Sequence, residues 1–256
     1  MASSEVFDMQ KAIDDVLRKV EEAQELRLES EFFDVRVVAV SKTKPKEMIV
    51  EAYNCGLRHF GENYVNELVE KASDPEILEM CPEIKWHFIG HLQTNKVAKL
   101  LGIPNLYMVQ TVDSTRLADA LEQKWAATGK EEPLNIMIQV NTSGEEGKSG
   151  ISPDQVIMHI THILDKCPHL SCLGLMTIGS AGHDLSLGPN PDFECLLKCR
   201  RSLHESPRII DPEVLFLETC ELSMGMSDDY EHAVELGSTC VRVGRCIFGA
   251  RDKKEQ

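Results

Sequence analysis

The sequence predicts an α/β protein built as a single (β/α)₈ barrel, the TIM-barrel fold, with one extra helix before the first strand. Short apolar segments rich in β-branched residues alternate with helical patterns, so that eight strands are expected along the chain. Strands that alternate with helices form parallel sheets. The chain has 256 residues, and a length near 250 is typical of a closed barrel of eight such units. An open doubly wound sheet remains an alternative, because periodicity cannot show closure.

The extra helix is expected over about residues 3–28. Apolar residues recur there at helical spacing, from Val6 to Val20, and charged residues fill most of the other positions. The barrel is expected over about residues 35–252. Its first strand is predicted in residues 35–40, VRVVAV, which are almost continuously apolar, as in a strand buried on both faces. The whole chain, 1–256, is then one barrel domain.

The other elements follow in order along the chain. Strands are predicted within 59–62, 85–90, 106–113, 134–142, 170–179, 215–224 and 239–244. Helices are predicted over 45–56, up to 72, and over 96–101, 114–128, 153–166, 192–203 and 227–237. Residues 180–191, SAGHDLSLGPNP, are rich in Gly, Pro and Asn, so we expect a loop or lid there.

Composition argues against several classes of protein. Asp and Glu number 42 against 27 Lys and Arg, a net charge of −15, so a broad nucleic-acid surface is not expected. The nine cysteines are odd in number and form no CxxC pair, which favours reduced thiols over disulfides or a zinc site, and no metal ligand is assigned. No stretch is long and apolar enough to cross a bilayer, and the first residues carry no apolar signal. We therefore expect a cytoplasmic protein.

Polar residues gather where the expected strands end, which is where barrels of this class carry their chemistry. Lys42 closely follows four consecutive apolar residues. Burial there would lower the pKa of the amine and free it to form a Schiff base with an aldehyde. The alternative is that Lys42, like Lys44 and Lys46, marks a solvated loop, and the spacing alone favours that alternative. The full set is Lys42, Glu62, Asn63, His87, His91, Thr111, Asp113, Asn141, Thr177, Ser223 and Arg242.

A second group combines small residues with hydroxyls. It comprises Ser223-Met-Gly-Met-Ser227 and, after the next helix, Arg242-Val-Gly244. Small residues let backbone N–H groups approach an anion, and the loops after the seventh and eighth strands are the usual phosphate site of this fold. The alternative is a turn with Ser227 capping a helix, and both can hold at once. His87 and His91 are expected to form hydrogen bonds or to pack, because their spacing across a strand end does not suit a metal pair.

Six segments, taken together, resemble the pyridoxal phosphate homeostasis protein family, also described as proline synthetase co-transcribed homologues. The resemblance runs from about residue 35 to 252, and GSAGHDLSLGPNPDF is similar to the eukaryotic branch. The six segments are VAVSKTKP (38–45), FGENYVNE (60–67), WHFIGHLQTNK (86–96), GLMTIGS (174–180), LSMGMSDD (222–229) and VRVGRCIFGARD (241–252).

The resemblance implies a barrel like the N-terminal domain of alanine racemase, with pyridoxal 5′-phosphate (PLP) at its mouth. Lys42 matches the Schiff-base lysine. Ser223 and Gly244 match positions that contact the phosphate, and Arg242 matches the arginine that faces the pyridine nitrogen. These matches imply that PLP is the cofactor.

Further positions follow from the same resemblance. Asn63, His87 and Met224 match positions that line the pocket. Two residues depart from the family pattern: Arg245 stands where Ser or Thr is usual, and Cys240 stands where the eukaryotic branch commonly has Asn. A hydroxyl donor to the phosphate is therefore missing, and the departure at Arg245 is expected to alter phosphate binding. Residues 204–220 also differ from the usual link into LSMGMS.

The resemblance implies a cofactor carrier in vitamin B6 and amino-acid homeostasis, without strong turnover and with no residue assigned as catalytic. Amino acids and PLP-dependent apo-enzymes are candidate partners, whereas nucleic acid and membrane are not. A PLP-dependent amino-acid racemase is the alternative, and a phosphate-binding barrel enzyme without a Schiff base is another. In alanine racemases a further C-terminal domain supplies a tyrosine base, whereas this sequence ends twelve residues after Gly244. We therefore expect little racemase activity.

Overall fold

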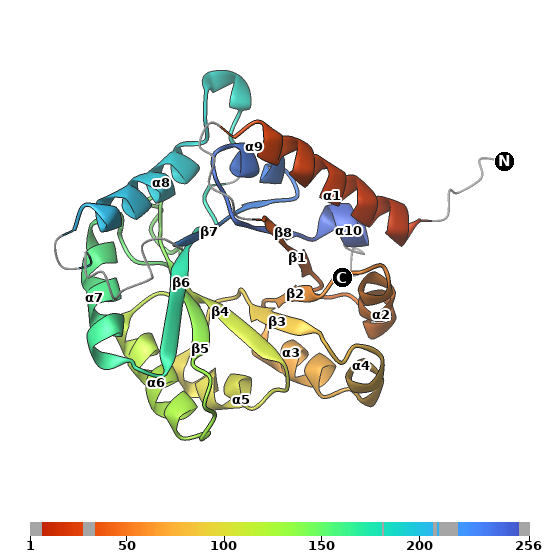
Figure 1. Cartoon of the computed structure of the whole chain (residues 1–256), viewed down its shortest axis with the longest axis horizontal. Coiled ribbons are helices and arrows are strands. Elements are labelled where there is room, and N and C mark those ends of the chain that lie inside the picture. The colour runs from red at the N-terminus through yellow and green to blue at the C-terminus, as the bar shows by residue number, and fades with distance from the viewer. Residues whose placement is uncertain (1–6, 28–33, 181, 207–208, 210–219, 251–256) are drawn as a thin grey trace.

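The protein is a closed (β/α)₈ barrel (Figure 1). The computed structural model describes residues 7–27, 34–180, 182–206, 209 and 220–250. Eight parallel strands pair in sequence order from β1 to β8, and β1 also pairs with β8. The ladder that joins the first strand to the last excludes the open doubly wound sheet, and the predicted barrel is confirmed.

The strands agree with the predicted order and differ at their ends. They are β1 Arg36–Val40, β2 His59–Glu62, β3 Lys85–Phe88, β4 Leu106–Val112, β5 Leu134–Gln139, β6 Leu170–Met176, β7 Glu221–Met226 and β8 Cys240–Val243. The seventh strand was predicted within 215–224, and residues 215–219 lie outside the described part of the chain. The differing link at 204–220 lies largely outside it as well.

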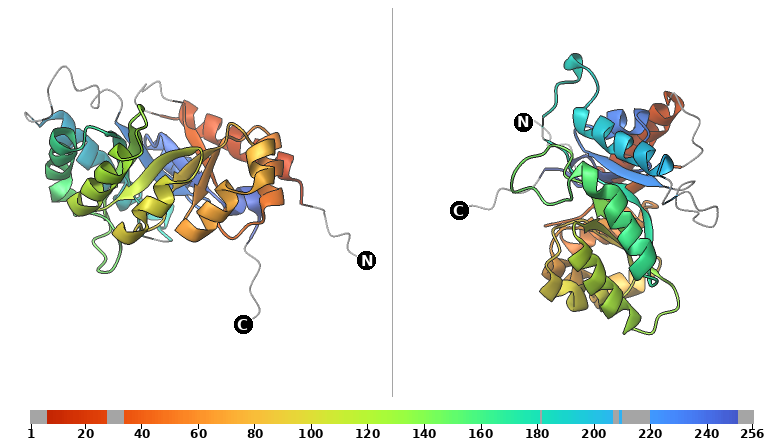
Figure 2. Two further views of the ribbon diagram at one scale, coloured as in Figure 1. Left: turned by 90° about the horizontal axis from the view of Figure 1, so that it is seen from below. Right: turned by 90° about the vertical axis from the view of Figure 1, so that its left-hand side faces the viewer.

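Helices surround the strands in the side views (Figure 2). They are α1 Met9–Glu25, α2 Lys46–Asn54, α3 Val65–Ala72, α4 Pro75–Met80, α5 Val97–Leu101, α6 Thr115–Ala126, α7 Val156–Lys166, α8 Pro191–His204, α9 Tyr230–Glu235 and α10 Arg245–Phe248. Three short 3₁₀ helices are η1 Thr94–Lys96, η2 Pro153–Gln155 and η3 Leu185–Leu187. The last of these lies within the predicted loop 180–191, which projects beyond the helical layer (Figure 2).

The extra N-terminal helix is present as α1, shorter than the predicted span 3–28. Asp8 caps it by accepting a hydrogen bond from the backbone N–H of Lys11. Its buried residues recur every three or four positions and pack against α9 and α10. The helix therefore closes the outer layer beside the last two strands (Figure 1). Residues 3–6 and 28 of the predicted span lie outside the described residues.

The inside of the barrel combines apolar and polar side chains. Alternation along β1 sends Val38 and Val40 inward, away from the outer core. Met108, Met137 and Met176 pack against one another as a separate apolar cluster, all fully buried. Next to them lies a buried chain of hydrogen bonds through His87 and other polar side chains.

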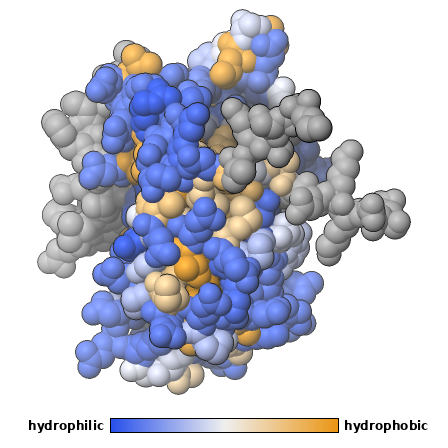
Figure 3. All heavy atoms as spheres, turned by 90° about the vertical axis from the view of Figure 1, so that its right-hand side faces the viewer, coloured by the Kyte–Doolittle hydropathy of each residue, from blue (hydrophilic) through white to orange (hydrophobic). Residues whose placement is uncertain are grey.

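The face shown in Figure 3 is hydrophilic over most of its area, and hydrophobic side chains gather across its middle. None of the helices in the described part of the chain combines the length and the apolarity that a bilayer-spanning helix needs.

Candidate functional site

A cavity of about 520 Å³ opens at the carboxyl ends of the strands. Its wall includes five of the residues predicted for the site: Lys42, Asn63, Arg242, Gly244 and Arg245. The volume falls in the range of small-molecule sites, about 300–1,000 Å³. These five residues come from four different loops and strands, and the closed barrel brings them together.

The turn after β1 presents Lys42 to the cavity. Val40 lines the cavity as well, and the two-residue period of the strand places Lys42 on the same side. The turn is closed by a hydrogen bond from the Lys44 N–H to the Ser41 carbonyl, 3.0 Å. Thr43 has φ of 62°, a left-handed conformation that a β-branched residue rarely adopts. Such strain costs about 1–3 kcal/mol and persists where the surroundings hold it.

A buried charged cluster holds this turn, and we call it the Lys71 network: Lys71, Glu62, Glu67 and Ser41. The Lys71 ammonium donates to the Ser41 carbonyl at 2.8 Å and to the carboxylates of Glu62 and Glu67 at 2.7 Å each. The Ser41 hydroxyl also donates to Glu62, at 2.7 Å. Glu67 in turn accepts the backbone N–H of Thr43. Lys71 and Glu62 therefore bond Ser41, and Glu67 bonds Thr43. The network holds both residues that flank Lys42.

The Lys71 network is costly to bury. The side chain of Glu62 is fully buried and that of Lys71 is 9% exposed. Burial raises the pKa of Glu62, against the opposing attraction of Lys71. The second carboxylate oxygen of Glu62 is buried with no hydrogen-bond partner. Removing Lys71 would leave an uncompensated charge in the protein interior.

Beside the Lys42 turn, across the pairing of β1 with β8, Ser227 joins the loops after β7 and β8. Its hydroxyl accepts the backbone N–H groups of Gly244 at 3.2 Å and Arg245 at 3.0 Å, an arrangement we call the Ser227 bridge. All three residues line the cavity. The alternative that Ser227 caps the next helix is wrong, because α9 begins at Tyr230 and no side chain caps it.

Glycine makes the approach to the Ser227 bridge possible. Gly225 has φ of 96°, and a Cβ there would lie 2.6 Å from the Cβ of Ala233. A larger residue would therefore meet both backbone strain and a clash with α9. The chain can turn at this point only because position 225 carries no side chain.

Arg242 is a fixed cation in the cavity wall. Its guanidinium donates to the Ser223 hydroxyl at 2.6 Å and to the Thr177 carbonyl at 2.7 Å. Only 4% of the residue is exposed, and this burial lowers the pKa of the guanidinium. Ser223 is fully buried beneath it and donates onward to Gln110 at 2.7 Å. Ser223 is not among the residues that line the main cavity, and it orients Arg242.

Two other residues expected at the pocket, His87 and Met224, are not among those that line the main cavity. His87 lies one residue before the end of β3 and is fully buried inside the barrel, where it bonds His59 at 2.8 Å and Gln110 at 2.9 Å. Burial lowers the pKa of His87 well below its ordinary value. Met224 follows the inward Ser223, so alternation along β7 sends its side chain outward into the outer core.

The two departures from the family pattern lie in different places. The Arg245 side chain forms an ion pair with Asp228 at the rim, where both are more than half exposed. Cys240 is fully buried, with its sulfur 3.7 Å from the Gln110 amide nitrogen. Arg245 can therefore affect a bound ligand directly, whereas Cys240 lies beneath the cavity.

Asn63 stands between the main cavity and a neighbouring one of about 220 Å³. Its carbonyl oxygen is held close to Gly90, since a Cβ on Gly90 would lie 1.9 Å away. The side-chain oxygen of Asn63 is buried with no hydrogen-bond partner. Buried acceptors are seldom left unpaired, which points to a ligand donor at this place.

Sequence reasoning missed the Lys71 network and the Ser227 bridge. Lys71 carried a weak signal, because it lies next to Ala72 and three residues after Leu68, both buried on α3. A lysine on an apolar helix face needs a partner. The spacing of four residues between Glu67 and Lys71 was a signal for that pair, whereas nothing in the sequence paired Lys71 with Glu62.

The chain matches known proteins over most of its length. The family described as "Alanine racemase, N-terminal domain" matches residues 23–252. The pyridoxal phosphate homeostasis protein of Homo sapiens is 58% identical over 217 residues, which cover 85% of this chain and 77% of the human one.

Two solved structures are also similar. PipY of Synechococcus elongatus, solved with PLP bound, has a TM-score of 0.74 and 28% identity, covering 94% of this chain and all of PipY. An alanine racemase of Clostridium difficile shares the fold, with a TM-score of 0.62 and 14% identity, covering 94% of this chain and 58% of the racemase. Together with the family match and the human relative, these similarities show that the chain belongs to the pyridoxal phosphate homeostasis protein family, whose barrel is that of the alanine racemase N-terminal domain.

Proposed function

We propose that this protein binds pyridoxal 5′-phosphate in the main cavity, as a Schiff base on Lys42, and acts in vitamin B6 and amino-acid homeostasis. The observation that carries the proposal is that Lys42, Arg242 and the Ser227 bridge line one cavity of ligand size. PipY, a relative of similar structure, was solved with PLP bound. The human relative is named pyridoxal phosphate homeostasis protein.

The residues of the cavity fit the three reactive parts of this cofactor. The Lys42 amine would bind the aldehyde carbon. The Ser227 hydroxyl, which accepts the backbone N–H groups of Gly244 and Arg245, keeps its own proton and would donate it to a phosphate oxygen. Arg242 would face the pyridine nitrogen, and Asn63 offers a buried acceptor without a partner. When bound, the cofactor supplies an aldehyde that reacts with amines and a ring that withdraws electrons.

The same geometry favours a carrier over a racemase. A guanidinium beside the ring nitrogen disfavours its protonation, and an unprotonated ring is a poorer electron sink. A two-base racemase also needs a second acid or base within reach of the Cα proton. None of the described residues that line the two cavities is a tyrosine. Amino acids or apo-enzymes could then exchange with Lys42 without turnover.

Borohydride reduction tests the attachment site. We expect reduced wild-type protein to gain one pyridoxyl group by intact mass, and Lys42→Ala to gain none. Lys44→Ala is a matched control, because Lys44 lines the same cavity but donates to the Ala250 carbonyl at 2.9 Å. A pyridoxyl adduct retained on Lys42→Ala at the wild-type level would move the attachment site elsewhere.

Turnover is tested separately. Deuterium exchange at Cα and chiral analysis of L-alanine and L-serine should show rates far below those of enzymes, since loss of one general acid or base alone costs about 10²–10⁴-fold. Racemisation at ordinary enzymatic rates that disappears in Lys42→Ala would favour the racemase.

A further inference from the structure

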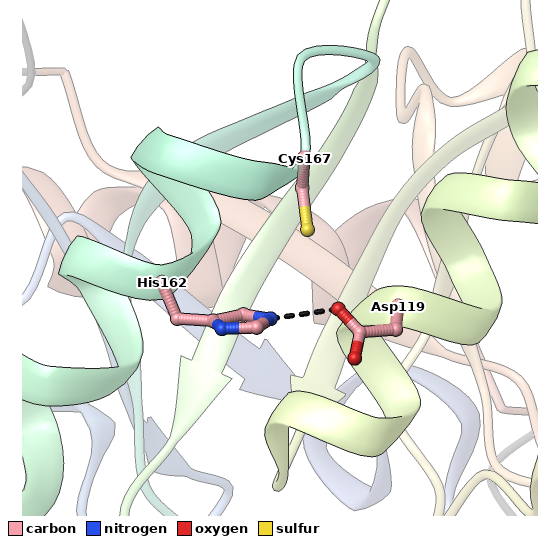
Figure 4. Close-up of side chains that lie close together, drawn as sticks. All are labelled: Asp119, His162 and Cys167. Carbon is pink, nitrogen blue, oxygen red and sulfur yellow. Dashed lines mark hydrogen bonds and ion pairs between the residues drawn. The ribbon is translucent and has the colours of Figure 1, made fainter.

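Three potential metal ligands of different chemistry meet on the outer helical layer, away from the residues of the cavity. Asp119 belongs to α6, His162 to α7, and Cys167 directly follows α7. Their donor atoms all lie within 4.8 Å of one another. Figure 4 shows the three side chains pointing toward a common space between the helices.

The three ligands sit on a firm scaffold. The Cys167 N–H donates to the Ile163 carbonyl at 2.9 Å, and the Cys167 carbonyl accepts from Leu170 at 3.0 Å, so its backbone is fixed between α7 and β6. The His162 Nε2 lies 2.7 Å from an Asp119 carboxylate oxygen. A tetrahedral ion with bonds of about 2.0–2.3 Å holds its ligands roughly 3.3–3.8 Å apart. Small side-chain rotations therefore suffice to bring the three atoms onto one ion.

The surroundings favour a cation. Burial and, after it, the carboxylates of Glu122 and Asp119 raise the pKa of the Cys167 thiol to about 11, so these two carboxylates place negative charge beside the thiol. Glu122 is itself held by His169, whose backbone N–H and ring nitrogen lie 2.9 and 2.6 Å from its two oxygens. Glu122 therefore adds negative charge beside the three ligands without being a ligand itself. Asp119 is 57% exposed and His162 28% exposed, which leaves solvent access on one side.

We propose that Asp119, His162 and Cys167 bind one zinc ion, with a water molecule as the fourth ligand. A set of thiolate, imidazole and carboxylate selects a borderline ion such as Zn²⁺ over Mg²⁺ or Ca²⁺, which prefer oxygen ligands alone. Binding forms bonds from zinc to sulfur, nitrogen and oxygen and releases the thiol proton to solvent. The ion ties α6 to α7. The spacing of cysteines along the chain predicts no such site, because the ligands converge only in the folded helical layer.

Cobalt is the probe, since Co²⁺ occupies zinc sites and reports its ligands by absorbance. Full-length protein treated with a chelator should bind one Co²⁺ per chain, with a sulfur-to-cobalt charge-transfer band and the visible bands of four-coordinate cobalt, all removed by Zn²⁺. Cys167→Ala and His162→Gln should weaken binding at least about 100-fold, and Asp119→Asn about tenfold. His162 is partly exposed, so His162→Gln keeps the test open if Cys167→Ala fails to fold.

Matched controls separate this site from the rest of the protein. His169→Gln removes a neighbouring imidazole that is not a ligand, and Cys55→Ala removes a partly buried thiol elsewhere. Both should bind cobalt within about threefold of the wild type. Binding without a sulfur charge-transfer band, no binding at all, or unchanged affinity in Cys167→Ala and His162→Gln would each overturn the proposal.

Discussion

The two sides of the main cavity are built on different principles. On the β1–β2 side, the Lys71 network holds the Lys42 turn with fully or largely buried charges. On the β7–β8 side, the Ser227 bridge gathers backbone N–H groups on one hydroxyl, and the nearest ion pair, Arg245 with Asp228, is exposed. The first side is therefore rigid at high energetic cost, whereas the second combines neutral donors at the rim with the buried cation Arg242. We expect substitutions to cost far more on the first side.

Lys71→Met should have the largest effect on stability of the substitutions considered on the two sides. It leaves Glu62 buried without its cation, so we expect the free energy of unfolding to fall by about 3–5 kcal/mol. Cofactor retention should fall as well, because the Lys42 turn loses its support. Chemical denaturation and the absorbance of the bound cofactor measure both effects.

The control for this prediction is Lys99→Met, which removes an exposed lysine whose ammonium donates to the Asn66 side chain at 2.8 Å. The double variant Lys71→Met with Glu62→Gln should recover part of the loss, because it removes both charges. A cost for Lys71→Met no larger than that of Lys99→Met would show that the two sides are held alike.

Acidification should destabilise the barrel interior that lies beneath both sides of the cavity. Burial, with the charges of Arg36 and Lys85, lowers the pKa of His59 to about 3, and burial lowers the pKa of His87 well below its ordinary value. Below about pH 6.5 the unfolded chain binds protons that the folded chain refuses, so stability falls as the pH falls. Between pH 7.5 and 5, burial of neutral His87 should therefore lower the free energy of unfolding.

The measurement is the free energy of unfolding at several pH values for the wild type and for His87→Gln. The variant should lose less stability on acidification than the wild type. Parallel curves for the two proteins would mean that His87 does not resist protonation in the folded state.

Ser227→Ala should have a moderate effect. It removes the acceptor shared by two backbone N–H groups, which costs about 1 kcal/mol of stability, and it should weaken cofactor retention about tenfold. Dialysis followed by absorbance measures the retention. Ser143→Ala is the matched control, since Ser143 lines the smaller cavity and should leave retention unchanged. Equal cofactor retention in both variants would show that Ser227 does not contribute to phosphate binding.

Arg245→Ser should have the smallest effect. The exposed ion pair with Asp228 contributes less than about 1 kcal/mol. A serine at this position adds a hydroxyl donor at the cavity rim, so we expect retention to rise a few-fold. A tenfold fall would show that the guanidinium itself holds the ligand.

The sequence predicted the barrel, and five of its predicted site residues, Lys42 among them, line the cavity, because period-two alternation and strand order determine where strand ends meet. It failed where depth or direction mattered. Position matching placed His87 and Met224 at the cavity, although His87 precedes the end of its strand and Met224 faces outward. The short helix α4 was also missed, despite the cap at Asp74 and the proline that follows it.

The Lys71 network could not have been predicted in the same way. Lys71 and Ser41 are 30 residues apart and belong to different elements, and no periodicity relates them. Their contact depends on how α3 packs beside the first two strands. Such buried charge pairs become visible only when the three-dimensional arrangement is known.

The methionine cluster inside the barrel gives the cavity a compliant floor. Met176 belongs to that cluster and also lines the cavity. An unbranched thioether with three rotatable bonds can change shape at little cost, whereas the strands around it are fixed by a closed ladder of hydrogen bonds. The depth of the cavity can therefore adjust to ligands of different thickness without any movement of the backbone. Oxidation of Met176 to its sulfoxide would replace this soft apolar surface with a polar one and abolish that adaptability.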